Sequence, residues 1–190
     1  MQTLVGNLPA GRCRQMFWML LLVMAALPVR AADVQPQMVK AAFVFNIAKF
    51  MSWPEGTDEQ APFTFCFYRR DSLGEAFELL QSRGIAGREL QARVVEKWRT
   101  SSGCDLLLVP EEELLAFKLE ARGLPTRPTL VVADLTDEES RGMAHTGVHV
   151  ALVRQGARIA FEVHLDELQR SGLKASSELL KLARIVRDNG

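Results

Sequence analysis

Apolar and polar residues follow one another along the chain with the periods of both helices and strands. Residues 38–50 form an apolar stretch of helical length, and residues 73–82 place apolar side chains on one helical stripe. A further helix is expected after Pro110, because proline suits the first turn of a helix. Short apolar runs predict strands at residues 63–68, 90–95, 106–109 and 129–133. Strands that alternate with helices in this way favour right-handed crossovers and a mostly parallel sheet.

The end of the chain departs from this alternation. Residues 147–153 and 158–165 are separated only by a tight turn at Gln155 and Gly156, which predicts an antiparallel hairpin. In the register that this turn imposes, His149 faces Glu162 across the two strands.

Helices at residues 165–170 and 176–186 are expected to complete the domain. The predicted fold is therefore a single α/β domain with a mixed, mostly parallel sheet, helices on both faces and a C-terminal antiparallel hairpin. About 160 residues are enough to bury one hydrophobic core. No internal repeat or Pro/Ser-rich linker divides the sequence.

The first helix carries few polar residues. On a helical wheel, Asn46 falls inside an apolar stripe with Val39, Phe43 and Phe50, so we expect its amide to be buried and bonded to backbone at the end of a strand or loop. Phe45 makes much of the remaining surface apolar too. Such a helix is either covered within the domain or leaves a patch for another chain.

The N-terminal residues have the three-part form of a secretory signal peptide. An unbroken apolar run at residues 16–27 follows Arg12 and Arg14, and small residues precede a cleavage position after Ala31. The run is shorter than the roughly 20 residues that a membrane span needs. We therefore predict a signal peptide at residues 1–31 and an exported domain at residues 32–190.

The charge balance of the exported chain argues against nucleic acid as a partner. Cleavage removes Arg12, Arg14 and Arg30 from the 23 basic residues and leaves 20 against 23 acidic ones. Binding of nucleic acid normally calls for a basic patch and a high pI.

Two cysteines remain after cleavage. Cys66 lies within residues 63–68, and Cys104 lies just before residues 106–109. In an oxidising compartment an isolated pair has one intramolecular connectivity, so a Cys66–Cys104 disulfide is predicted. Two buried free thiols are the alternative. The chain has no C-x-x-C spacing, which disfavours a redox-active role.

Sequence motifs of catalysis are missing. There is no Gly-rich phosphate loop, no G-x-S-x-G elbow and no H-E-x-x-H, and no cofactor is predicted. His149, Glu162 and His164 share the polar face of the hairpin and could present two imidazoles and a carboxylate to zinc. A metal-free His149 and Glu162 pair is the simpler interpretation.

Residues 39–50, running on to Trp53 and Pro54, resemble the opening motif of the YfiR family. The resemblance continues through Cys66, Gly103 and Cys104, and then through residues 128–134, 158–166 and 173–186. It therefore spans nearly the whole exported chain.

The resemblance implies a non-enzymatic periplasmic repressor. Proteins of this family bind the periplasmic sensor part of an inner-membrane diguanylate cyclase of the YfiN type and hold it inactive, which represses cyclic di-GMP synthesis and biofilm formation. An outer-membrane lipoprotein resembling YfiB can sequester the repressor. A homodimer is also expected. The competing function is a periplasmic small-ligand-binding or zinc-dependent protein. The candidate partner or dimer surface comprises Phe45, Lys49, His149, Glu162 and His164.

We predict that export is followed by cleavage near Ala31. N-terminal sequencing of the exported protein should start near Ala32. A membrane-bound product that retains residues 16–27 would contradict the predicted compartment.

Overall fold

The computed structural model describes residues 35–54, 60–136 and 147–187, and the predicted signal peptide at residues 1–31 lies outside them. A seven-stranded sheet has the order β3-β2-β4-β5-β6-β7-β9, and β1 and β8 form a separate antiparallel pair. The strands are β1 (Met51–Ser52), β2 (Phe63–Tyr68), β3 (Leu90–Val95), β4 (Leu106–Pro110), β5 (Leu130–Leu135), β6 (Val150–Gln155), β7 (Arg158–His164), β8 (Lys174–Ala175) and β9 (Arg184–Val186).

Helices connect and cover these strands. The α-helices are α2 (Pro36–Lys49), α3 (Glu75–Gln81), α4 (Leu114–Ala121), α5 (Leu165–Arg170) and α6 (Ser177–Leu182), and the 3₁₀ turns are Trp98–Thr100 and Glu111–Glu113. Among the described residues, no helix combines the length and the apolar character that a membrane crossing requires.

The sheet is mixed and mostly parallel, as the sequence predicts. Neighbouring strands from β3 to β6 run parallel, β6 and β7 form the antiparallel hairpin, and β9 joins β7 in parallel. β2 is the first strand of this sheet along the chain, β3 lies beside it at the edge of the sheet, and β4 lies on the other side of β2. The α/β fold class is therefore confirmed.

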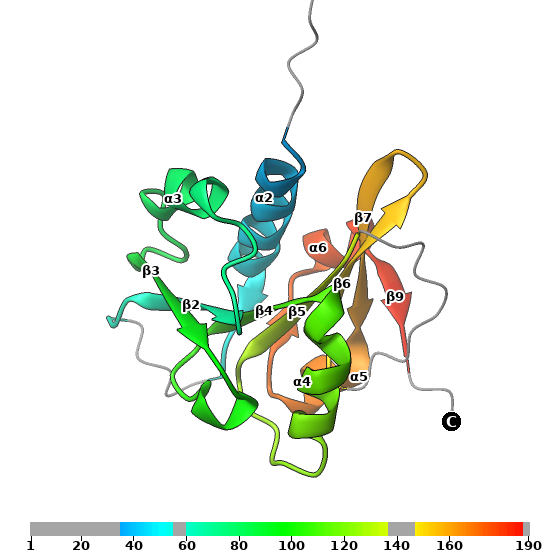
Figure 1. The fold of residues 1–190 in the computed structure, drawn as a ribbon. Coiled ribbons are helices and arrows are strands. Elements are labelled where there is room, and N and C mark those ends of the chain that lie inside the picture. The colour runs from blue at the N-terminus through cyan, green and yellow to red at the C-terminus, as the bar shows by residue number, and fades with distance from the viewer. Residues whose placement is uncertain (1–34, 55–59, 137–146, 188–190) are drawn as a thin grey trace, which may run out of the picture. The chain divides into compact units, whose positions relative to one another are not determined.

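Helices lie on both faces of the sheet, and Figure 1 shows α4 in front of it with α2 on the other side. Alternate residues of the strands supply the two cores. Phe65 and Leu108 pack in the core under α2 and α3, whereas Cys66 and Leu107 pack in the core under α4. Because both faces are buried, the central strands are apolar at nearly every position.

The predicted hairpin exists, but its predicted register is wrong. Gln155 pairs with Arg158, so the turn residues are Gly156 and Ala157. Glu162 lies opposite Ala151, and His149 continues the ladder opposite His164, whose N–H donates to the His149 carbonyl oxygen at 2.9 Å. A shift by two residues keeps every side chain on its predicted face, because the period of a strand is two.

The last predicted helix is also too long. It ends at Leu182, and the next residues form β9 beside β7. The apolar spacing of residues 179–186 suits a helix, but the free edge of β7 offers backbone hydrogen bonds to Arg184–Val186. Leu182, the last residue of α6, is 77% exposed.

A buried ion pair fixes the start of β4. Both guanidinium Nη atoms of Arg88 donate to the Asp105 carboxylate at 3.0 Å, and the Thr64 backbone N–H donates to the same carboxylate at 2.7 Å. Trp53 Nε1 donates to the Asp105 carbonyl oxygen at 3.1 Å. These contacts join β2, β4, the turn before β3 and the segment after α2.

The predicted Cys66–Cys104 disulfide is present, with the two Cα atoms 5.8 Å apart. Cys66 lies in the middle of β2, and Cys104 directly precedes Asp105. Both cysteines are buried in the core under α4. The bond therefore closes a loop with a sequence separation of 38 residues that contains α3 and β3.

We expect Cys104→Ser to lower the free energy of unfolding by up to about 4 kcal/mol, because the crosslink restricts the unfolded chain. Chemical denaturation of both proteins under oxidising conditions measures the difference. Cys66→Ser and the double variant should match Cys104→Ser, since each lacks the same crosslink. An unchanged unfolding midpoint would show that the bond does not stabilise the domain.

Candidate functional site

Helix α2 has one buried side and one open side. The buried side faces the sheet and includes Ala41, Val44, Phe45 and Ala48. The open side carries Val39, Phe43, Asn46 and Phe50, with a spacing of three or four residues that places them along one line. Apolar residues occur on both sides, so one apolar side of α2 packs against the domain and the other lies beside a cavity.

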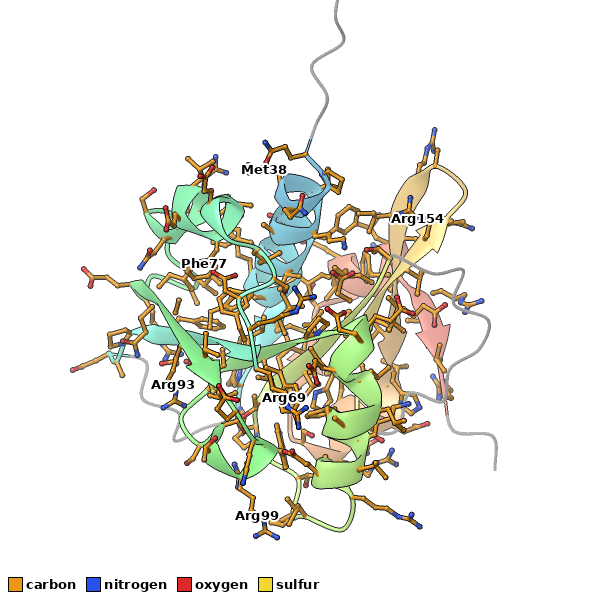
Figure 2. All side chains as sticks on the ribbon, viewed as in Figure 1. Met38, Arg69, Phe77, Arg93, Arg99 and Arg154 are labelled. Carbon is orange, nitrogen blue, oxygen red and sulfur yellow. A yellow bond between two sulfur atoms is a disulfide. The ribbon has the colours of Figure 1, made fainter. Side chains whose placement is uncertain are left out.

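This cavity is a groove of about 540 Å³ between α2, β7 and α6. Met38, labelled in Figure 2 near the start of α2, also lines it. Phe161 of β7 forms the floor and contacts Phe43 with ring centroids 6.3 Å apart. Leu179 and Leu182 of α6 supply the opposite wall. Asn46 and Glu178 are the polar side chains of an otherwise apolar lining.

The structure corrects the predictions for α2. Asn46 is exposed and lines the groove, so it is not the buried structural amide that we expected. Phe45, predicted on a partner surface, is buried against the domain. Lys49 is exposed, with its Nζ atom 5.8 Å from the centre of the Phe45 ring. The sequence analysis placed the stripe that contains Asn46 on the buried side of α2, whereas it lies on the open side. The sequence does not show which side is buried, because apolar residues occur all round this helix.

A second buried ion pair sets the orientation of α2. Lys40 Nζ lies 3.0 Å from Asp134 Oδ2, with both side chains about nine-tenths buried. The other carboxylate oxygen of Asp134 accepts from the Thr136 hydroxyl at 2.7 Å. Asp134 is the second-to-last residue of β5, so this pair ties the first half of α2 to the carboxyl end of that strand. It thereby holds the open side of α2 towards the groove.

His149 is buried, with 4% of its surface exposed, so it does not form part of an outer surface of the described chain. Its Nδ1 accepts from the Val131 backbone N–H at 2.9 Å, and its Nε2 lies 2.7 Å from the Ser171 hydroxyl oxygen. Because Nδ1 is an acceptor, the proton of the neutral ring sits on Nε2 and is donated to Ser171. A histidine in this tautomer cannot take the serine proton, so the pair lacks the arrangement of a nucleophilic serine and its base.

Glu162 and His164 are buried as well, which also removes them from the predicted surface. Glu162 pairs with Arg184 of β9, and His164 Nδ1 accepts from the Glu167 N–H at the start of α5. Within the described residues, no cluster of three or more histidine, cysteine or carboxylate side chains is arranged to hold a metal ion. The polar face of the hairpin thus serves to attach β9 and α5.

Burial lowers the pKa of His149 to about 4, because a charged imidazole would lose its hydration. Glu167 favours the charged form of His149, but not enough to offset burial, and His164 and Arg170 oppose it. Burial raises the pKa of Glu167 itself, whereas Arg170 and the Gly147 N–H together hold it below its ordinary value. His149 is therefore neutral and Glu167 charged at pH 7.

The sequence analysis did not predict the groove, although it identified the stripe of Val39, Phe43, Asn46 and Phe50 that lines one side of it. Its floor and far wall come from Phe161 and residues 178–182, more than 110 positions after the stripe begins at Val39. The signal in the sequence was the small number of polar residues on α2, which favours either full coverage or an open patch.

Comparison with known families identifies the chain. Residues 37–184 match the model of the YfiR/HmsC-like family, and the chain belongs to that family. It is a family of periplasmic regulators of diguanylate cyclase signalling, and its members are regulatory rather than catalytic. None of the curated proteins compared with the chain matches it.

We expect acid to destabilise the fold through His149. The unfolded chain binds a proton at His149 as the pH falls through about 6.5, whereas the folded chain binds it only near pH 4. The stabilisation of the fold by neutral His149 is therefore complete above pH 6.5 and is lost progressively as the pH falls towards 4. The free energy of unfolding should drop by about 2 kcal/mol from pH 7 to pH 5. Denaturation at both pH values measures it.

His149→Asn is the matched variant, because its amide oxygen can still accept from the Val131 N–H. It should be less stable than the wild type at pH 7 but lose less stability on acidification. If both proteins lose the same free energy, His149 is not the responsible group.

Proposed function

We propose that this chain is a non-enzymatic periplasmic repressor that binds the periplasmic sensor part of an inner-membrane diguanylate cyclase. Occupancy of that sensor part holds the cyclase inactive, so cyclic di-GMP synthesis and biofilm formation fall. The proposal joins the family membership to one structural observation: the family motif helix α2 presents an open apolar groove.

The groove supports binding rather than catalysis. Its lining offers apolar contact area together with Asn46 and Glu178, and no histidine or cysteine among the described residues lines it. Burying such a surface in a complex is favourable by about 25 cal/mol per Å² of apolar area before the costs of association. Binding at this face can therefore provide affinity for a protein partner.

The remaining elements of the proposal follow the family resemblance. The chain would act in the periplasm after loss of residues 1–31, with residues 32–190 as the working domain. A YfiB-like outer-membrane lipoprotein would sequester it and release the cyclase. A homodimer is part of the same proposal.

Deletion of the gene should raise cyclic di-GMP and surface attachment, and expression of the full chain should restore both. Nucleotide extraction with mass spectrometry measures the first, and crystal-violet staining the second. Tagged mature protein should also retain a diguanylate cyclase from detergent-solubilised inner membranes. Unchanged cyclic di-GMP in the deletion strain, or membranes that yield no cyclase, would overturn the proposal.

A further inference from the structure

Exposed bulky apolar side chains occur at several places on the described chain, and two of them lie at the groove. Leu79 and Val94 stand on α3 and β3, and Leu115 and Leu119 on α4, but none of them lines the groove. Phe50 and Leu182 are exposed at 40% and 77% and both line it. The groove therefore continues into an exposed apolar rim, which is typical of a surface that another protein covers.

The length of the groove fits a helical partner. Its stripe on α2 runs from Val39 to Phe50, which corresponds to about 16 Å of helix, or three turns. An amphipathic helix of that length places apolar side chains at positions i, i+3, i+4 and i+7 into such a groove.

The acidic side chain of the groove favours a partner helix that carries a basic residue. Glu178 is the ionisable side chain of the lining, and neither its carboxylate nor the Asn46 amide has a side-chain hydrogen bond or ion pair within the described residues. A partner with a carboxylate at this place would meet repulsion, whereas a lysine or arginine would meet an acceptor.

We propose that the groove receives an amphipathic helix from the periplasmic part of the cyclase, with a lysine or arginine of that helix paired with Glu178. The apolar face of the helix packs against Phe43, Phe161 and Leu182. This inference rests on the proposed function and assigns the surface and the chemistry of the partner.

Site-specific photocrosslinking tests the surface in cells. Benzoylphenylalanine at position 182 should capture the cyclase, and the same residue at position 119, an exposed position on α4, should not. Mass spectrometry of the crosslinked peptide should find an amphipathic segment with a basic residue. Capture at position 119 alone, or a captured segment without a basic residue, would overturn the inference.

Affinity for the detergent-solubilised full-length cyclase tests the energetics. Leu182→Glu should weaken binding by about tenfold or more, because it places a charge in the apolar contact. Leu119→Glu is the matched control and should bind like the wild type. Glu178→Gln should weaken binding by about two- to fivefold, less so at high salt. Glu75→Gln, an acid in the first turn of α3, should have no effect.

The thermal midpoint of each variant separates folding from binding. Native-like Leu182→Glu with full affinity would exclude the groove, and undiminished binding by Glu178→Gln would exclude the ion pair. If the wild type itself does not bind the cyclase, the proposed function fails. If the wild type binds and the groove variants bind equally well, only the assigned surface is wrong.

Discussion

The buried pair of Arg88 and Asp105 is the constraint on which the sheet depends. Asp105 accepts from both Arg88 Nη atoms and the Thr64 N–H, and Arg88 donates further to the carbonyl oxygens of Ala61 and Pro62. Loss of either charge would leave its partner buried and uncompensated, at a cost of about 3–5 kcal/mol. With the neighbouring Cys104 disulfide, the pair fixes where β4 begins, and β5 aligns from there through the Leu130 N–H.

Helices α2 and α5 and strand β9 are attached to the domain by other hydrogen bonds and ion pairs. His149 holds α5 through Ser171, Glu162 holds β9 through Arg184, and Lys40 holds α2 through Asp134. Each link uses a charged or polar group on an element outside the central parallel strands. These links leave one side of α2 open, and that open side is part of the groove. The surface on which the proposed function depends is thus the one that these internal links leave open.

The sequence predicts local structure well and distant packing poorly. β2 and β3 are predicted to the residue, because each is a compact run bounded by turn or charged residues. The side of α2 that faces the core is decided by Asp134, 94 positions after Lys40, and no local pattern shows it. The helical spacing of residues 179–186 is overruled by the free edge of β7. Cys66 and Cys104 are predictable because a single pairing exists.

The short β1–β8 ladder joins the two walls of the groove at one end. β1 directly follows α2, β8 precedes α6, and the Ser176 N–H donates to the Phe50 carbonyl oxygen at 2.9 Å. No comparable backbone bond joins α6 to the first turn of α2 within the described residues. The two walls are therefore tied to each other by backbone hydrogen bonds near Phe50, so a change in the β1–β8 ladder would alter the groove first at that end.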